Sequence, residues 1–454
     1  MNIPINGRIA IIDDKIEQAL PLMNVLARRR YACQYFSADR RYLPEEGQEP
    51  NDIRILFLDI NLLDDAIHPA KQLRGILVTV LRRVISAANF PWVLIYWSRH
   101  EEEHGALVKD IFDHDLHDRK PIVYLSQNKS DYFSMDGDLI GDTKINELFG
   151  LITERLLEQP AYRQLIAWEN LLHRAADKTL QDIFHALHLH SNWTDNAGFL
   201  LERLGESFAG KIAFRGQSAE EKIRSAFQTL NNVYADTLEY AVSNTGISRP
   251  AELSYDPGFA SRENIYKINK KLLLSTDTER VDYSGMVIQD TDPDRDKVYK
   301  ELLNSSFGRE KVKKEAPEGA TQKEIDKMAS ERREAIRASW RKIHVVVTPL
   351  CDVVQGKAVN SRVIHGFLVR EDLKGYIEDR SEAIFVSPKF DIGGTVYALV
   401  LNLRYFYTTH FDPKTLQEQG LTPLFRVRQS LLSEIQSKLA RHISRQGVLF
   451  IDEV

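Results

Sequence analysis

Three acidic residues stand at the ends of two apolar segments early in the chain. Asp13 and Asp14 directly follow the segment RIAII at residues 8–12, and Asp59 directly follows IRILFL at residues 53–58. Carboxylates that converge repel one another unless a cation joins them, and an all-oxygen set of ligands suits Mg²⁺, which keeps several of its waters. If the two segments are neighbouring strands, the sequence predicts a magnesium site that a phosphoryl group can complete.

Two later polar residues have the chemistry that phosphoryl transfer to a carboxylate needs. Ser98 follows the apolar segment WVLIYW at residues 92–97 and can offer a hydroxyl group to a phosphoryl oxygen. Lys129 stands just beyond the segment IVYL at residues 122–125 and can offer an ammonium group to the same oxygens. The order along the chain is therefore acid pair, single acid, hydroxyl and lysine.

The elements that must position these side chains alternate between strand and helix. Near-continuous apolar segments are typical of strands that are covered on both faces. They occur at residues 8–12, 31–36, 53–58, 92–97 and 122–125, of which 31–36 is the weakest. Helical patterns lie between them, at residues 15–30, 72–88 and 105–115. This alternation predicts a doubly wound α/β fold with a parallel sheet, in which ligands bind at the carboxyl ends of the strands.

This order of residue types on these elements resembles the CheY-like receiver domain of bacterial response regulators. The resemblance implies a five-stranded parallel sheet and covers under a third of the chain. It implies that Asp13 and Asp14 hold Mg²⁺, and that Asp59 joins them at the metal and accepts the phosphoryl group. It further implies that Ser98 is the switch hydroxyl and that Lys129 binds the phosphate.

The chain departs from the receiver pattern in its spacing. The intervals from Asp59 to Ser98 and from Ser98 to Lys129 are longer than expected for the family, and no proline follows Lys129. Aspartates at strand ends also cap helices and orient loops. A pseudo-receiver without phosphotransfer, acting as a scaffold or adaptor subunit, is therefore the alternative to a phosphorylated switch.

Three further segments follow the receiver-like domain, which we place at residues 1–142. Residues 143–246 have apolar residues at three- and four-residue spacing and no strand pattern, which predicts a helical domain. Residues 247–341 are rich in Pro, Gly, Asp and Ser over most of their length, which predicts an irregular insertion or linker. The pair Thr321 and Glu324 forms a capping-box pattern that opens a charged helix at the end of this segment.

The last segment, residues 342–454, changes to strand-like alternation with turn residues between the strands. This pattern predicts a small antiparallel sheet or barrel. A terminal helix is expected to follow and to pack on the sheet, because Thr422 can cap it, Pro423 suits its first turn and Gly447 can end it.

The composition limits the classes of protein to which the chain can belong. Its 454 residues are 43% hydrophobic and 28% charged, which is enough for two or three domains with real cores. The net charge of -5 gives no global basic field for nucleic acid or an anionic membrane. Only two cysteines, no signal-peptide layout and short apolar runs lead us to expect a soluble cytoplasmic protein without a membrane span.

The sequence does not indicate a conventional enzyme. It contains no phosphate-loop, dinucleotide-binding, zinc-protease or nucleophile-elbow motif. Cys351 has His344 and His365 on nearby segments, but the sequence shows no means of stabilising an oxyanion, and a small buried thiol is the expected role of this cysteine.

The leading hypothesis is a response-regulator-like signalling protein, in which the receiver domain controls a partner-binding output module in the C-terminal half. The overall arrangement is also similar to receiver-bearing proteins found beside kinase-like ATPases in bacterial conflict and anti-phage loci. The resemblance implies an upstream partner of the histidine-kinase or ATPase kind, and bacterial defence as the setting.

An effector that binds nucleic acid through the C-terminal segment is a further alternative. Small barrels bind single strands through stacking aromatic side chains and a positive groove. Three aromatic residues stand beside a basic one in LRYFYTTH at residues 403–410, although strand aromatics are more often part of a core. The basic residues that could contribute are Arg426, Arg428, Lys438, Arg441 and Arg445.

Overall fold

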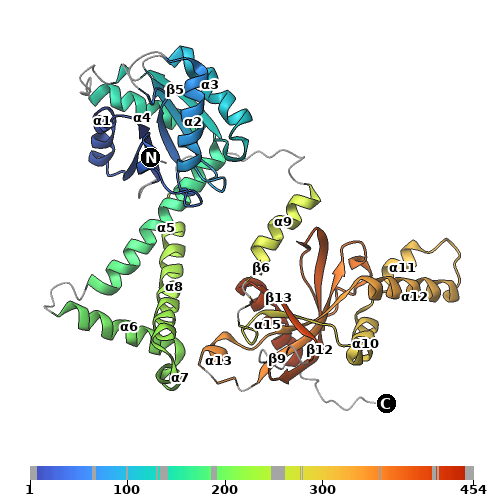
Figure 1. The fold of residues 1–454 in the computed structure, drawn as a ribbon. Coiled ribbons are helices and arrows are strands. Elements are labelled where there is room, and N and C mark those ends of the chain that lie inside the picture. Colours follow the sequence, from blue (N-terminus) through green and yellow to red (C-terminus); the bar gives the residue numbers. More distant parts are fainter. Residues whose placement is uncertain are drawn as a thin grey trace. The chain divides into compact units, whose positions relative to one another are not determined.

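A computed structural model shows the fold of the chain (Figure 1). It describes residues 8–63, 68–98, 101–128, 131–132, 142–185, 192–246, 261–276, 278, 280–355, 357–358, 360–411, 416 and 419–444. At residues 97, 98, 101–104, 142, 145 and 157 it describes the backbone alone.

The chain divides into two compact units. The first consists of Met1–Ser191 and Asn231–Leu253, and the second consists of Asn192–Leu230 and Ser254–Val454. The chain therefore enters the second unit, returns to the first within helix α8 (Ala219–Asn244) and then leaves it again. Each unit has a sheet and apolar clusters of its own.

The first unit contains a parallel sheet whose five described strands have the order β2-β1-β3-β4-β5. This confirms the doubly wound α/β fold of the N-terminal third, and it is compatible with a receiver-like fold. The strand order reverses at β1, which pairs with both β2 and β3, and such a reversal is where ligands bind in sheets of this kind. The strands are β1 (Ile9–Asp13), β2 (Cys33–Ser37), β3 (Ile55–Asp59), β4 (Val93–Ser98) and β5 (Val123–Asn128).

Helices cover both faces of this sheet (Figure 1). Side chains of β1 alternate between two apolar clusters: Ile9 and Ile11 belong to one, and Ala10 and Ile12 belong to the other. Because both faces are covered, the strand is apolar at every position, which is why it reads as a continuous apolar run. The helices are α1 (Ile16–Arg28) and α4 (Asp142–Leu157) on one face and α2 (Ala70–Val84) and α3 (Glu101–His114) on the other.

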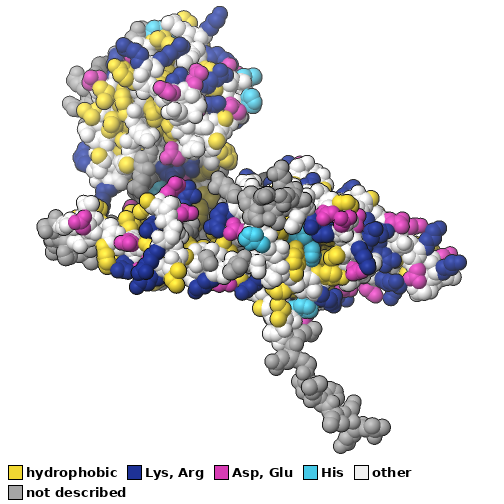
Figure 2. All heavy atoms as spheres, turned by 60° about the horizontal axis from the view of Figure 1, so that its bottom comes forward, with side chains coloured by type: hydrophobic (Ala, Val, Ile, Leu, Met, Phe, Trp, Pro, Cys, Tyr) yellow, Lys and Arg dark blue, Asp and Glu magenta, His cyan; other side chains and the backbone are white. Residues whose placement is uncertain are grey.

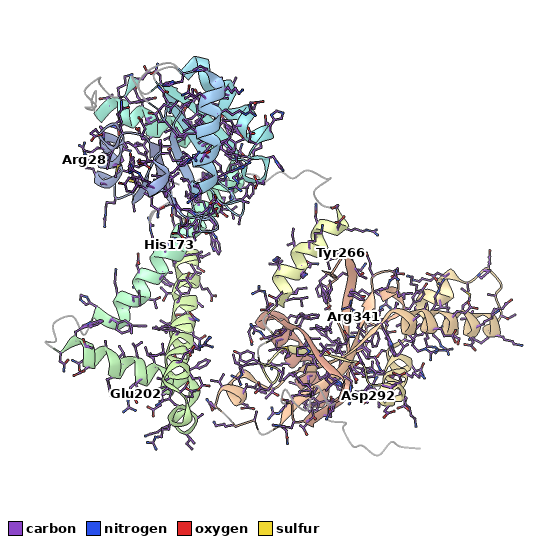
Figure 3. The ribbon with its side chains drawn as sticks, in the orientation of Figure 1. Arg28, His173, Glu202, Tyr266, Asp292 and Arg341 are labelled. Carbon is purple, nitrogen blue, oxygen red and sulfur yellow. The ribbon has the colours of Figure 1, made fainter. Side chains whose placement is uncertain are left out.

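Helix α5 (Pro160–Phe184) is anchored to the amino ends of β1 and β3. The Glu169 carboxylate pairs with Arg8 at 2.7 Å and with Arg54 at 3.1 Å, and each of the three side chains is at most 16% exposed. The Nε of Arg8 also donates a hydrogen bond at 3.1 Å to the Nε2 of His173. His173 lies on α5 (Figure 3). Because Arg8 and Arg54 directly precede β1 and β3, this anchor lies at the end of the two strands opposite to the acidic residues.

The predicted helical segment is confirmed in the described residues. After α4 and α5, the chain forms α6 (Trp193–Ala209), α7 (Lys211–Gly216) and α8. Over the ranges that the structure describes, no helix is both long enough and apolar enough to cross a membrane.

The second unit contains a curled antiparallel sheet with eight described strands. Seven follow the order β10-β12-β9-β8-β7-β13-β6, and β11 pairs with β12. This confirms the antiparallel sheet expected in the C-terminal segment. The strands are β6 (Leu274–Ser275), β7 (Met286–Asp290), β8 (Arg341–Val346), β9 (Ser361–Arg370), β10 (Ile384–Val386), β11 (Phe390–Ile392), β12 (Thr395–Thr409) and β13 (Leu421–Val427).

Helices also pack on this second sheet. Ile435 of the terminal helix belongs to one apolar cluster with Val345, and Ile336 belongs to another with Phe367. The terminal helix therefore packs on the sheet, as the sequence predicts. The helices concerned are α15 (Gln429–Ile443) in the first cluster and α10 (Asp296–Ser306), α11 (Glu310–Glu315) and α12 (Gln322–Ser339) in the second.

The charged helix predicted from the capping box is α12. The Thr321 hydroxyl accepts the backbone N–H of Glu324 at 3.4 Å, and the Glu324 carboxylate accepts the backbone N–H of Thr321 at 2.7 Å. Acidic and basic side chains are intermingled on the surface of the α11 and α12 region, so this surface carries no field of one sign (Figure 2).

The segment read as an irregular insertion is in fact structured where it is described. It contains α9 (Arg262–Leu273), β6, β7, α10 and α11, and β7 is an internal strand of the second sheet. Some of the polar residues that suggested loops cap these elements instead: Ser261 accepts the backbone N–H of Asn264, and Asp292 accepts that of Asp294. The elements are short, so their apolar residues form no long periodic pattern.

The start of the terminal helix is also corrected. Thr422 and Pro423 belong to strand β13, and the helix begins at Gln429. Phe425 and Val427 are buried, and β13 pairs with β7 and β6. Pro423 lies beside an irregularity in the strand register, where a residue without a backbone N–H is tolerated.

Candidate functional site

The acidic residues lie at the carboxyl end of the first sheet, at the point where its strand order reverses. Asp13 is the last residue of β1, and Asp59 is the last residue of β3. The two strands pair in parallel, with Ile12 opposite Leu58, so their terminal aspartates lie side by side. Asp14 follows directly after β1.

The three carboxylates come together, as their positions in the sequence predict. One oxygen of each of Asp13, Asp14 and Asp59 lies within 4.8 Å of the other two. Asp13 is fully buried, Asp59 is 5% exposed and Asp14 is half-buried. Among the described residues, no other three His, Cys, Asp or Glu side chains approach one another this closely.

Local backbone turns set the direction of two of these side chains. The Oδ1 of Asp13 accepts the backbone N–H of Lys15, and the Oδ1 of Asp59 accepts the backbone N–H of Asn61, each at 3.0 Å. A carboxylate that accepts the N–H two residues further on forms an Asx turn. Both strands therefore end in the same turn, which gives the two carboxylates equivalent positions at the sheet edge.

Tyr35 of β2 also contacts this site, although the sequence did not single it out. Its hydroxyl donates a hydrogen bond to the backbone carbonyl oxygen of Asp13 at 2.9 Å. Burial, and then the charges of Asp13 and Asp14, raise the pKa of Tyr35 to about 12. The only signal in the sequence was its place in the weakest strand pattern, residues 31–36.

The donor set of this site fits a magnesium ion. All three side chains offer carboxylate oxygens, and hard cations such as Mg²⁺ prefer oxygen ligands. Three carboxylates this close repel one another at neutral pH, and a divalent cation removes that repulsion. Asp13, Asp14 and Asp59 are thus the residues that could hold the ion.

For the other two predicted site residues, Ser98 and Lys129, the structure describes no side chain. Ser98 is the last residue of β4, and the neighbouring Trp97 pairs in register with Asp59, so the backbone of Ser98 lies at the same edge of the sheet. The description of Ser98 is confined to its backbone. Lys129 lies outside the described residues, one position after β5 ends at Asn128.

The second unit contains a buried polar cluster that the sequence did not reveal. His344 is 2% exposed; its Nδ1 accepts a hydrogen bond from Tyr407 at 2.7 Å, and its Nε2 donates one to Asp290 at 3.1 Å. Asp290 also pairs with Arg295 at 2.7 Å. His365 faces His344 across the β8–β9 pair, and its ring stacks on Tyr407 with 4.5 Å between centroids.

Burial keeps both histidines of this cluster neutral. It lowers the pKa of His344, even though hydrogen bonding to Asp290 opposes this shift. Burial lowers the pKa of His365 to about 3, and the second cause is the repulsion that His365 would meet from His344 when that ring is also protonated. The folded state therefore resists protonation of these rings at a pH where an unfolded chain accepts it.

The second unit should consequently lose stability in mild acid. Between the ordinary histidine pKa of 6.5 and about 3, the unfolded chain binds a proton at His365 that the folded chain does not. Each such proton lowers the free energy of unfolding by up to about 1.4 kcal/mol per pH unit in this window. The thermal midpoint of the second unit, measured by calorimetry from pH 7 to pH 4, should fall with a shallower slope in His365→Phe than in the wild type.

A surface histidine provides the matched control for this experiment. His410 is an exposed histidine of the second unit, so His410→Phe makes the same change of side chain at the surface and should leave the pH slope of that unit as in the wild type. The lowered pKa of Asp290 adds to the loss of stability near pH 4, because the unfolded carboxyl, with an ordinary pKa of 3.8, begins to bind protons there. Both variants retain Asp290, so the comparison concerns the part of the slope that is lost with the His365 ring. Equal slopes for the wild type and His365→Phe would contradict the proposed origin of the acid sensitivity.

The cysteine does not take part in this cluster. Cys351 lies on the short helix α13 (Leu350–Val354) and is exposed, so the expectation of a buried thiol is wrong. The segment PLCDVV forms a helical turn after Pro349, which carries the thiol to the surface instead of continuing the strand.

The C-terminal basic residues are distributed over several elements. Arg426 lies on β13, and Arg428 donates hydrogen bonds to the backbone carbonyl oxygens of Lys271 and Leu274. Lys438 donates one to the carbonyl oxygen of Ile384. These contacts engage Arg428 and Lys438 with the backbone of the second unit. Arg441 is exposed on α15, and Arg445 lies outside the described residues.

Comparison with known proteins identifies no relative of this chain. The chain matches no protein-family model, no curated protein and no solved structure.

Proposed function

We propose that the first unit is a receiver-like phosphoryl switch, in which Asp59 accepts a phosphoryl group while Asp13, Asp14 and Asp59 hold Mg²⁺. The observation that carries the proposal is the convergence of three carboxylates within 4.8 Å at the reversal point of a 2-1-3-4-5 parallel sheet. This is the place and the donor set that transfer of a phosphoryl group to a carboxylate requires.

The proposed reaction is a displacement at phosphorus. A carboxylate oxygen of Asp59 attacks the phosphorus atom of a donor such as acetyl phosphate, the P–O bond to acetate breaks, and acetate leaves with the electron pair. Bound Mg²⁺ would offset the charge on the phosphoryl oxygens. The Asx turn at Asn61 holds the Asp59 side chain in a fixed direction, so that attack needs little rearrangement.

The consequence proposed for the rest of the protein is a changed contact with a partner. A phosphoryl group adds charge at the sheet edge, and the resemblance assigns Ser98 and Lys129 to its recognition. The upstream donor would be a histidine-kinase-like or ATPase protein, and the output would be a protein contact of the C-terminal half. Bacterial defence is the setting that the resemblance suggests.

Phosphorylation can be tested on the full chain with acetyl phosphate and Mg²⁺. We expect the intact mass of the wild type to increase by one phosphoryl group, and we expect no increase in Asp59→Asn or in the presence of excess chelator. Asp52→Asn is the matched control, because Asp52 is an exposed acid ahead of the same strand β3. It should be labelled as the wild type is.

Two results would contradict the proposal in different ways. An unlabelled wild type that still binds Mg²⁺ would favour the scaffold or adaptor alternative. Labelling of Asp59→Asn to the wild-type level would show that another residue is the acceptor.

A further inference from the structure

A cavity of about 310 Å³ lies within the second unit. It is bounded by the helices α6 and α8 on one side and by the start of β7 and the end of β13 on the other. Apolar side chains form part of its lining, namely those of Phe208, Met286 and Val354. Its volume lies at the lower end of the range of small-molecule sites.

Basic side chains outnumber acidic ones among the described residues that line the cavity. Arg224 of α8, Arg280 of the loop before β7 and Arg426 of β13 all line it. Glu221 is the one carboxylate among the described lining residues, so three guanidinium groups and one carboxylate leave a formal charge of +2. Three separate elements therefore bring positive charge to one small space, in a chain whose net charge is -5.

The carboxylate of Glu221 caps the first turn of α8. Glu221 accepts the backbone N–H of Ser218 at 2.8 Å and its hydroxyl at 2.9 Å, which closes the first turn of α8. The same bonds to Ser218, and then the charges of Arg280 and Arg224, hold the pKa of Glu221 below its usual range. Glu221 remains charged, but its carboxylate is fixed at the helix end.

Two arginines also pair with acids outside the cavity lining. Arg280 lies 3.1 Å from Asp282, and Arg224 lies 2.6 Å from Glu220. All four of these side chains are at least 44% exposed, and exposed pairs of this kind contribute little to stability. An anion with stronger hydrogen-bonding geometry can displace them.

Tyr283 brings two of the guanidinium groups together. The Arg280 and Arg426 guanidinium carbons lie 5.4 Å and 5.2 Å from the centroid of its ring. Gly285 makes this possible: its φ is +89°, and a Cβ there would lie 2.8 Å from the carbonyl oxygen of Val427. Glycine thus lets the loop that carries Tyr283 lie directly against β13.

We propose that this cavity binds a small phosphorylated molecule with at least two negative charges. Guanidinium groups bind phosphate oxygens through paired, charge-assisted hydrogen bonds, and three of them suit a diphosphate or a larger phosphate group. The amides of Gln217 and Gln228 can form hydrogen bonds with other polar groups of such a ligand, and the apolar lining can contact its non-phosphate part. Nucleoside diphosphates combine these properties.

A second hollow in the same unit is a weaker candidate. It is lined by several basic residues, but Lys389 pairs with Glu371 at 2.9 Å and Arg370 pairs with Asp372 at 3.1 Å. Both carboxylates of its lining are therefore paired with basic side chains of the same lining. Its remaining formal charge of +2 comes from Arg262 and Lys311 alone, whereas three guanidinium groups line the first cavity.

Calorimetric titration of the full chain with ADP and with inorganic pyrophosphate, at low ionic strength, tests the proposal. We expect both probes to bind and Arg426→Met or Arg280→Met to weaken binding by about ten-fold or more, since each removes hydrogen bonds to a charged group. Arg224→Met should act similarly, and because Arg224 is 71% exposed on α8, this variant keeps the test valid if the others fail to fold.

The control variant is Arg404→Met, which removes an exposed arginine of β12 outside the cavity. It should bind both probes as the wild type does. The proposal is overturned by absence of binding at millimolar concentrations, by equal loss in Arg404→Met, or by citrate binding as tightly as pyrophosphate. Tighter binding of a single-stranded oligonucleotide, lost in the same arginine variants, would overturn it in favour of a nucleic-acid site.

Discussion

Replacing Asp13 with asparagine should stabilise the metal-free first unit and remove the stabilisation that Mg²⁺ provides. Asp13 is fully buried, and one of its oxygens lies within 4.8 Å of both other carboxylates. At that separation each repulsion is of the order of 1–3 kcal/mol. Loss of the charge removes two such repulsions, so the free energy of unfolding should rise by about 2 kcal/mol or more. The asparagine Oδ1 can still accept the backbone N–H of Lys15, so the turn is preserved.

The opposite signs of the two effects make this variant diagnostic. Thermal melting of the full chain should show a higher midpoint for Asp13→Asn than for the wild type in chelator, and a midpoint that no longer rises with added Mg²⁺. The exposed control Asp52→Asn should change the free energy of unfolding by less than about 0.5 kcal/mol and keep the response to Mg²⁺. A destabilised Asp13→Asn that still responds to Mg²⁺ would mean that the three acids do not share an ion.

Removing the side chain of Asp290 should destabilise the second unit by about 3–5 kcal/mol, because it breaks a buried ion pair and leaves charge uncompensated. The Asp290 side chain has no solvent exposure and lies 2.7 Å from Arg295 and 3.1 Å from His344. Its Oδ1 also accepts the backbone N–H of Asp292 at 3.0 Å, which ties the end of β7 to the following turn. Asp290→Ala therefore removes several interactions at once.

Calorimetry of the full chain can measure this loss in the melting transition of the second unit. Asp294→Ala is the matched control, since Asp294 is an exposed acid four residues away, and its substitution should cost less than about 0.5 kcal/mol. A double variant with His344→Phe should lose less than the sum of the single losses, because both residues belong to one network. A loss in Asp290→Ala no larger than that of the control would contradict the structural role assigned to Asp290.

The elements that the sequence predicted well are those with a long or uniform pattern. The inner strands β1, β3 and β4 are apolar at nearly every position because both faces of the sheet are covered, and so they are visible without any knowledge of their partners. The capping box at Thr321 and Glu324 located the start of α12 to the residue. The meeting of Asp13 and Asp59 followed from the general rule for parallel sheets.

The features that escaped prediction depend on contacts between distant segments. Strand β7 has five residues, and nothing local shows that it lies between β8 and β13. The Asp290–His344–Tyr407 cluster joins three strands that are up to 117 positions apart, so no motif could reveal it. Pro423 was read as a helix start because proline at a strand irregularity is recognised only from its partner strand.

The anchoring of α5 has a practical consequence for anyone who shortens this chain. Ile152 and Ile166, from α4 and α5, share an apolar cluster with Ile9 and Ile55 of the first sheet. A fragment ending at residue 142 would lack α4 and α5 and would therefore uncover Ile9 and Ile55. It would also leave Arg8 and Arg54 without their counter-ion Glu169. Such a truncated piece should aggregate or melt early whatever the state of its acidic edge, so experiments on isolated fragments should carry the sequence through at least the end of α5.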